Sequence, residues 1–344
     1  MKMRYYYICL VLLLSNVCSD MVFADSAAVV SRSRPLLHTF VEIKAWGDHA
    51  ETAIEEAFAE MERVNNLLNN YDARSEISRI NQHAGNRAVP ISPETMEALT
   101  HAIAFCDKTG GALDITIGPL LRLWGFGTDE VGISSPEPDA AARARAKSLV
   151  DYRALELFEQ RTADGLIKRS ARLARKGMWI DVGSFSKGYV ADRALIILKK
   201  RGISHALIVA GGTILARGHK PDGSLWQIGI QHPRKPGQLL TVVSLTDCAI
   251  STSGDYEIYY EKKGTRRTHI IDPRTGEPVP HLQSVSVIAP DGMTSDALST
   301  SLFVLGPDNG IKLVKNYPGV EALIVSEGGK ITVSEGWPTK PIAY

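Results

Sequence analysis

Apolar side chains recur every three or four residues along several stretches of the chain, the spacing that places them on one face of a helix. The pattern predicts helices over residues 50–68, 75–81, 92–109, 185–201, 294–305 and 307–317. Ser92 is well placed to cap the third of these helices, and Pro93 suits its first position. The predicted helices are spread over both halves of the chain, and the long stretches between them lack this helical spacing of apolar residues.

Short apolar runs separated by turn residues fill these intervening stretches and predict strands. We expect one strand over 36–46, a run of short strands over 156–180 and a succession of strands from 206 to 288. Two more are expected over 322–325 and 330–333. Strands that follow one another, instead of alternating strictly with helices, favour an α+β fold with a large, mostly antiparallel sheet content and flanking helices.

The N-terminus has the pattern of an export signal. Lys2 and Arg4 precede an almost wholly apolar run over 5–14, and small or apolar residues lead up to Ala24. This predicts a secretory signal peptide over 1–24, cleaved after Ala24, and hence a periplasmic protein. The apolar run is shorter than the ~20 residues of an ordinary membrane-spanning helix, which makes an uncleaved anchor the lesser alternative.

Lipid attachment at Cys18 stays open as a lesser alternative, because the residues ahead of Cys18 form a poor lipobox. We expect residues 25–344 to form a single domain, in which two lobes are possible. The net charge of +1 and the lack of a basic stripe argue against nucleic acid as a partner. Cys106 and Cys248 are the cysteines that follow the leader, and the sequence leaves open whether they pair.

A short polar segment follows the apolar run 178–180. Asp181, Ser184 and Lys187 fall within seven residues, where a helical pattern begins. If the helix starts near Phe185, Ser184 is its N-cap and Lys187 lies in its first turn, where backbone N–H groups and an ammonium can hold a phosphate. On spacing alone, an ordinary serine N-cap beside a solvated lysine is the simpler interpretation.

A second polar pair lies far downstream. Asp296 and Thr300 are four residues apart, so on a helix they share one face. A carboxylate and a hydroxyl suit Mg²⁺, which keeps waters and phosphate oxygens as its other ligands. Taken alone, the simpler interpretation is that Asp296 caps the helix while Thr300 packs or bonds back to a carbonyl.

Further polar positions are candidates for ligand contacts. His269 begins a short apolar strand and is either a base or phosphate contact or a structural residue. Asp114 lies in an apolar run, where a lone carboxylate needs hydrogen-bond partners or a ligand. Tyr71, at the exit of a helix, can stack on a planar ring. The segment Ser251-Thr-Ser-Gly254 is expected to be a polar turn, which either lines a site or is only a turn.

Taken in order along the chain, these segments resemble the ApbE family, the FAD:protein FMN transferases. The likeness extends from about Leu36 to Trp337. The motifs that carry it are Tyr71 with Ser75-Glu-Ile-Ser-Arg-Ile-Asn81, Gly110-Gly-Ala-Leu-Asp114, Gly118-Pro119, Trp124-Gly-Phe-Gly127, Asp181-x-Gly-x-x-x-Lys-Gly188, Trp226 with Gly229-Ile230 and Pro233, Ser251-Thr-Ser-Gly254, His269-Ile-Ile-Asp-Pro-x-Thr-Gly276 and Asp296-Ala-Leu-Ser-Thr300.

The resemblance implies an α+β protein, commonly exported, that binds FAD as its substrate together with Mg²⁺. It implies transfer of FMN from FAD to a threonine of an acceptor protein through a phosphoester bond, with release of AMP. Acceptors in the family are typically subunits of membrane redox complexes. The expected partners are therefore FAD and an acceptor protein of that kind.

By position, the resemblance also assigns the site residues. The FAD contacts fall on Tyr71, Ala112, Leu113, Asp114, Asp181, Lys187 and Ile271. The metal ligands fall on Ser184 (through its backbone carbonyl), Asp296 and Thr300. His269 falls on the family's histidine near the phosphates.

The chain departs from the family pattern at two places. The usual Met-Gly-Thr near the start reads Leu37-His38-Thr39, which removes a glycine from a tight backbone approach. The usual Gly-Gly followed by an acid reads Gly211-Gly212-Thr213. Neither departure affects the predicted metal ligands.

The implied reaction is attack of the threonine hydroxyl on the FMN-side phosphorus of FAD, with AMP as the leaving group. Mg²⁺ would neutralise the phosphate oxygens and Lys187 would add positive charge. Asp296 and His269 are both candidates for the general base. Two other functions remain open: a Mg²⁺-dependent FAD pyrophosphatase that uses water and yields FMN and AMP, and a non-catalytic exported FAD-binding protein. The Asp296/Thr300 pair speaks against the second.

Overall fold

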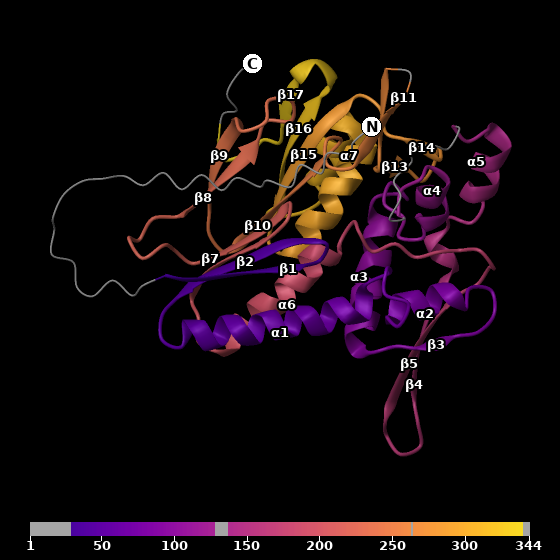
Figure 1. Cartoon of the computed structure of the whole chain (residues 1–344), viewed down its shortest axis with the longest axis horizontal. Helices are drawn as coiled ribbons and strands as arrows, with labels where there is room; N and C mark the ends of the chain where they lie inside the picture. Colours follow the sequence, from indigo (N-terminus) through magenta and orange to yellow (C-terminus); the bar gives the residue numbers. More distant parts are fainter. Residues whose placement is uncertain (1–28, 128–136, 263, 340–344) are drawn as a thin grey trace.

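An eight-stranded sheet forms the centre of the computed structural model, which describes residues 29–127, 137–262 and 264–339 (Figure 1). All neighbouring strands in it are antiparallel. Their order is β1 (Val30–Leu36), β2 (Thr39–Trp46), β6 (His205–Ala210), β7 (Thr213–Arg217), β10 (Cys248–Gly254), β15 (Leu282–Ala289), β16 (Glu321–Ser326) and β17 (Ile331–Val333). The predicted signal peptide lies outside the described residues.

Three long helices cover one face of this sheet: α1 (Ala50–Leu68), α6 (Ser186–Lys200) and α7 (Gly292–Val314). α3 (Pro93–Lys108) packs against α1 and α7, α2 (Glu76–Gln82) packs against α1 and β5 (Ile167–Leu173), and α4 (Gly118–Leu123) packs against α5 (Ala140–Lys147). α6 packs between α1 and α7, and α7 lies against β10 and β15. Among the described residues, no helix combines the length and apolar character needed to cross a bilayer.

Smaller sheets complete the fold. They pair β3 (Val89–Pro90) and β4 (Leu155–Arg161) with β5 (Ile167–Leu173), β8 (Trp226–Gln231) with β9 (Leu239–Leu245), β11 (Tyr259–Lys262) with β12 (Thr265–Thr268), and β13 (Ile271–Asp272) with β14 (Glu277–Pro278). β4 and β5 project from the body as a hairpin (Figure 1). Two 3₁₀ turns lie at Tyr152–Ala154 and Glu327–Gly329.

Both faces of the sheet are covered, as the central strand β6 illustrates. Its alternate side chains point in opposite directions. Ile208 joins the core beneath α1 and α6, whereas Val209 packs on the other side with Trp226 and Val243 of the β8–β9 pair. The predicted α+β class, with antiparallel strands and flanking helices, is therefore confirmed.

The helices were predicted well because periodicity and capping agreed. α1 has the predicted bounds, and Ser75 and Ser92 cap α2 and α3 by accepting hydrogen bonds from the N–H groups of Ser78 and Thr95. The predicted break between two helices near residue 306 is also present, since Gly306 interrupts α7 with φ 75° and ψ 176°.

Three predictions of local structure were wrong. Residues 36–46 are not one strand but the end of β1 and all of β2, joined by a turn at Leu37 and His38. Ser251–Gly254 is not a turn but part of β10, whose hydroxyls are covered by α7. His269 lies between β12 and β13 rather than in a strand.

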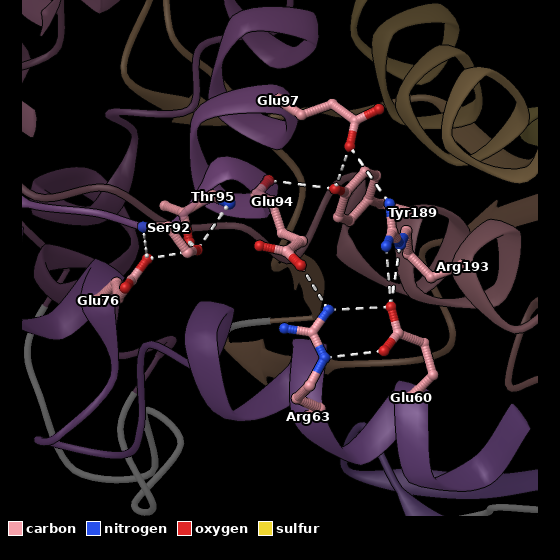
Figure 2. Close-up of polar contacts among 9 residues, drawn as sticks. All are labelled: Glu60, Arg63, Glu76, Ser92, Glu94, Thr95, Glu97, Tyr189 and Arg193. Atoms are coloured by element: carbon pink, nitrogen blue, oxygen red, sulfur yellow. Dashed lines mark hydrogen bonds and ion pairs between the residues drawn. The ribbon is translucent and has the colours of Figure 1, made fainter. Parts of the chain in front are cut away.

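A network of ion pairs holds α6 against α1 and α3 (Figure 2). Arg63 of α1 pairs with Glu60 and, at 2.6 Å, with Glu94 of α3. Arg193 of α6 donates to the same Glu60 at 3.0 Å, and the Tyr189 hydroxyl donates to Glu97 at 2.8 Å. These contacts fix the position of α6 relative to both neighbouring helices.

α6 and α7 approach each other backbone to backbone. A Cβ atom at Gly188 would lie 2.1 Å from the carbonyl oxygen of Gly292, and one at Gly292 would lie 2.7 Å from the carbonyl oxygen of Gly188. The Asp192 carboxylate accepts hydrogen bonds from the N–H groups of Gly292 and Met293 at 2.7 and 2.8 Å. The crossing thus requires glycine at both positions, and the Asp192 carboxylate of α6 ties it to the first turn of α7.

We expect Gly188→Ala to destabilise the protein by about 3 kcal/mol or more, because the new methyl group must force the two backbones apart. Chemical denaturation measures this free energy of unfolding. Gly310→Ala, also in α7, is the matched control, because its Cβ atom would meet a side-chain methyl group of Ile324 at 3.2 Å and no backbone atom. It should change stability by no more than about 1 kcal/mol, and equal effects of the two substitutions would contradict the close crossing.

Candidate functional site

Asp296 and Lys187 meet where α6 crosses α7. Asp296 is buried, and its Oδ2 atom accepts a hydrogen bond from the N–H group of Gly188 at 3.0 Å. Its Oδ1 atom lies 3.8 Å from the Lys187 ammonium. The helix is capped instead by Asp291, which accepts from the N–H group of Thr294. The simpler interpretation of Asp296 as a cap was therefore wrong.

Thr300 follows Asp296 by one turn of α7 and faces β10. Its hydroxyl lies 3.3 Å from that of Ser253, which also lies 2.8 Å from the hydroxyl of Ser299. Asp296 and Thr300 therefore lie on one side of α7, as their spacing predicts. Both carry oxygen atoms, and Asp296 lies against the start of α6 through its contacts with Gly188 and Lys187.

The Lys187 side chain folds back over the loop that leads into α6. Its ammonium donates a hydrogen bond to the carbonyl oxygen of Gly183 at 3.2 Å. α6 begins at Ser186, after Phe185, and no side chain caps it. The prediction that Ser184 caps this helix was wrong, because the buried Phe185 occupies the cap position. Lys187 is not simply solvated either, since it pairs with Asp296.

Asp181 is half-buried on the other side of the same loop. Its carboxylate accepts hydrogen bonds from the N–H group of Gly183 at 2.9 Å and from the side chain of Asn70 at 3.1 Å. Burial raises the pKa of Asp181, while these two hydrogen bonds and the charges of Lys187 and Arg122 oppose the rise. The loop before α6 thus holds the Asp181 carboxylate close enough to the Lys187 ammonium for the two charges to interact.

A cavity of about 410 Å³ opens beside Asp181. It is lined by Asn70, Tyr71, Ala73, Ser78, Gln82, Gly118, Leu121, Arg122, Gly127, Trp179 and Asp181. The Arg122 guanidinium lies 3.1 Å from the centre of the Trp179 ring. Tyr71 is 52% exposed. Planar groups therefore surround this cavity, which suits a planar ligand.

His269 approaches Lys187 from the segment after β12. Its Nδ1 atom lies 3.1 Å from the carbonyl oxygen of Ile258, which also accepts from the His269 backbone N–H. A carbonyl oxygen only accepts, so Nδ1 carries the proton and Nε2 carries none. Burial and, to a smaller extent, the Lys187 ammonium lower the pKa of His269 to about 4, although the hydrogen bond to Ile258 opposes this shift. The imidazole is therefore neutral at pH 7.

Glu257 is a residue that the sequence did not single out. It lies in the turn after β10, and its Oε1 atom would be 3.5 Å from a Cβ atom at Gly212. Desolvation, opposed by the charge of Lys187 and assisted by that of Asp296, raises the pKa of Glu257 to about 7. No periodic or spacing pattern marks this position. Glu257 comes near Lys187 because the chain turns directly after β10.

The remaining predicted FAD contacts are Ala112, Leu113, Asp114 and Ile271, and the segment that follows Asp114 is bound to the site, because the carbonyl oxygen of Ile115 accepts from the N–H group of Asp181 at 2.8 Å. Asp114 accepts hydrogen bonds from the backbone and hydroxyl of Thr116 at 2.8 and 2.7 Å and from the N–H group of Tyr152 at 3.1 Å. Burial raises the pKa of Asp114. Its carboxylate is thus satisfied by the chain itself. Ala112, Leu113 and Ile271 are buried in apolar clusters.

The structure therefore brings together Asp181, Lys187, His269, Asp296 and Thr300, and places Tyr71 on the adjoining cavity. The described residues hold no group of three or more His, Cys, Asp or Glu side chains suited to a metal ion. The described cysteines, Cys106 and Cys248, are both free.

Comparisons with known proteins agree on one family. A sequence model of the ApbE family matches residues 37–324. The FAD:protein FMN transferase of Haemophilus influenzae is 34% identical over 89% of the chain and 89% of its own length. The FAD:protein FMN transferase of Escherichia coli K12 is 33% identical over 80% of the chain and 77% of its own length.

Solved structures give the same result. The crystal structure of the ApbE protein from Thermotoga maritima superposes with a TM-score of 0.80 at 32% identity, covering 90% of this chain and 98% of that one. The flavin transferase ApbE from Vibrio cholerae superposes with a TM-score of 0.77 at 29% identity, with the same coverage of both chains.

We expect the imidazole of His269 to titrate near pH 4 rather than near 6.5, because burial and the Lys187 ammonium disfavour its charged form. NMR of ¹⁵N-histidine-labelled protein between pH 8 and 4 measures this, and the spectrum of His269→Gln identifies the signal. Lys187→Met should raise the pKa of His269. Titration of His269 near pH 6.5 would contradict the assignment.

The same shift has a consequence for stability. The unfolded chain binds this proton near pH 6.5 and the folded chain near 4, so this contribution lowers stability as the pH falls through that interval. His269→Gln should remove that part of the pH dependence.

Proposed function

The chain belongs to the ApbE family, and we propose how its site carries out the family reaction. The enzyme is a FAD:protein FMN transferase, which moves FMN from FAD to an acceptor protein. The observation that carries the proposed mechanism is the meeting of Lys187 with Asp296 across α6 and α7, beside Thr300 and the cavity at Asp181.

The oxygen donors of the site fit a magnesium ion. Gly188 fixes Oδ2 of Asp296, whereas Oδ1 lies beyond hydrogen-bond distance of Lys187. That oxygen, the Thr300 hydroxyl and the Ser184 carbonyl are proposed as ligands. One carboxylate is enough, because Mg²⁺ keeps waters and phosphate oxygens as its other ligands. When bound, the ion would supply positive charge to the diphosphate of FAD.

The residues that line the cavity indicate where the flavin ring and the diphosphate of FAD bind. We place the flavin ring against the exposed face of Tyr71, because aromatic rings stack with an offset on planar partners. The diphosphate then extends past Asp181 toward Lys187. Asp181 itself is held by Asn70 and Gly183, so its position does not depend on the substrate.

The chemical step is attack of an acceptor threonine oxygen on the FMN-side phosphorus. A new P–O bond forms, the P–O bond to AMP breaks, and the proton of the hydroxyl passes to a base. Lys187 stabilises the charge that grows on the phosphate oxygens. Asp296 and His269 both remain candidates for the base. Nε2 of His269 carries no proton and can accept one, but its pKa of about 4 makes it a weak base.

The setting of the reaction is also a proposal. We propose that the chain is exported to the periplasm after cleavage behind Ala24, and that the acceptor is a subunit of a membrane redox complex. We propose that residues 25–344 form a single domain. The continuous sheet from β1 to β17, which spans residues 30–333, supports this.

We expect purified protein to add the mass of FMN to a threonine of an acceptor protein and to release one AMP per FMN transferred, when FAD and Mg²⁺ are supplied. Intact mass spectrometry and chromatography of AMP measure both products. EDTA should abolish them, and excess Mg²⁺ should restore them. AMP without modified acceptor would indicate the pyrophosphatase instead, and neither product would indicate a FAD carrier.

We expect Asp296→Asn to lower the transfer rate at least about 100-fold, because the amide keeps an oxygen for Gly188 but loses the negative charge that holds a cation. Asp296→Ala should be at least as inactive. Asp308→Ala, an exposed position on the same helix, is the control and should keep full activity. Thermal unfolding shows whether each variant folds, and a folded Asp296→Asn with normal transfer would rule out Asp296 as a metal ligand.

A further inference from the structure

The Thr300 hydroxyl must present a lone pair, and not its proton, to a bound cation. A hydroxyl carries one proton and two acceptor lone pairs, and it rotates until a partner fixes the proton. Thr300 lies on the side of α7 that faces β10, where its hydroxyl is 3.3 Å from that of Ser253. The direction of this hydrogen bond therefore decides whether the Thr300 oxygen is available to a metal ion.

The neighbouring contacts of Ser253 determine that direction. The Ser299 hydroxyl donates to the backbone carbonyl oxygen of Asp296 at 2.9 Å, and a carbonyl oxygen only accepts. Because its single proton is used there, Ser299 accepts from the Ser253 hydroxyl, which lies 2.8 Å away. Ser253 then has no proton left for Thr300, so Thr300 donates across the 3.3 Å contact. The Thr300 proton thus points toward β10, and the lone pairs of its oxygen stay available to another partner.

Ser253 has a fixed position from which to accept this proton. It lies in β10, where its backbone pairs with Val285 of β15, and α7 packs against both strands. Ser299 is buried, whereas Ser253 is half-buried. Neighbouring side chains of a strand point to opposite faces, so Thr252 points away from α7. Its hydroxyl makes a similar contact there, 2.8 Å from that of Ser286. β10 therefore carries a matched pair of hydroxyl contacts, and the one at Ser253 reaches Thr300.

We propose that Ser253 is a positioning residue for the metal site, which orients the Thr300 hydroxyl so that its oxygen faces a divalent cation. Residues that bond to a metal ligand fix its orientation, and their loss weakens metal binding. Ser253 acts through Thr300 and needs no contact of its own with the cation. This inference rests on the proposed function, because it takes Thr300 as a ligand. It gives the serine-rich end of β10 a part in the reaction.

Binding of Mn²⁺, a paramagnetic substitute for Mg²⁺, tests this proposal without the transfer reaction. Protein saturated with FAD is titrated with Mn²⁺ in the absence of an acceptor, and free Mn²⁺ is measured by electron paramagnetic resonance. A titration of FAD alone corrects for metal bound in solution. We expect Ser253→Ala to bind Mn²⁺ about tenfold more weakly than the wild type. Thr252→Ala, which loses the matched contact on the other face of β10, should bind Mn²⁺ as the wild type does.

Removal of the ligand itself shows whether Ser253 acts through Thr300. Thr300→Val keeps the shape of the side chain and loses the hydroxyl, so it should weaken Mn²⁺ binding at least as much as Ser253→Ala does. In the Thr300→Val background, Ser253→Ala should cause no further loss, because its partner is already absent. A purely structural role of Ser253 predicts that the two losses multiply. Multiplied losses, or wild-type Mn²⁺ affinity in Ser253→Ala, would overturn the proposal.

The Mg²⁺ dependence of FMN transfer gives a second measurement. Ser253→Ala should need about tenfold more Mg²⁺ for half-maximal transfer and keep its rate at saturating Mg²⁺ within about threefold of the wild type, since excess metal fills the weakened site. A lower rate with an unchanged Mg²⁺ requirement would contradict a positioning role. Thermal unfolding shows whether each variant is folded.

Failure of the proposed function appears separately. A wild-type protein that yields neither modified acceptor nor AMP, but shows the expected pattern of Mn²⁺ binding, would overturn the transferase and leave the role of Ser253 standing. A wild-type protein that binds FAD but no Mn²⁺ would overturn both the proposed ligands and this inference.

Discussion

The site depends on how closely α6 and α7 approach each other. With glycine at 188 and 292, the two backbones come within contact distance, and only then can the Gly188 N–H group reach Asp296 and bring the Lys187 ammonium beside it. Asp192 completes the crossing by accepting hydrogen bonds from the first two N–H groups of α7. Burial raises the pKa of Asp192 to about 7, so the fold retains an unfavourable buried acid to hold the crossing.

The crossing also concentrates negative charge around one ammonium. Desolvation raises the pKa values of Asp181, Asp192 and Glu257, and the charge of Asp296 contributes to the rise for two of them. Lys187 opposes the rise for Asp181 and Glu257. A cation bound at Asp296 would favour the ionised forms of these acids. This arrangement of acids around Lys187 supports the proposal of a Mg²⁺ ion at Asp296.

Local sequence signals predicted the helices and the α+β class, because periodicity and caps act over a few residues. The site was predicted only from the order of several motifs, since neither Asp181–Lys187 nor Asp296–Thr300 is distinctive alone. Long-range packing explains what was missed. Glu257 joins the site through a turn, and the Leu37–His38 turn carries neither glycine nor asparagine as a signal.

β10, part of which the sequence predicted to be a turn, shows how the fold positions Thr300. β10 presents hydroxyls to α7, so that Ser251 lies 2.7 Å from the hydroxyl of Ser295 and Ser253 bonds to Ser299. Small polar side chains let α7 lie close to β10 while the hydroxyls of Ser251 and Ser253 find partners on the helix. The sequence of residues 251–254 predicts a turn, because small polar residues are typical of turns and the sequence does not show that these residues are buried. The Thr300 hydroxyl, 3.3 Å from Ser253, lies at the edge of these pairs. A proposed metal ligand is thus positioned by the contacts that attach α7 to the sheet, and a change in that packing would move the ligand with it.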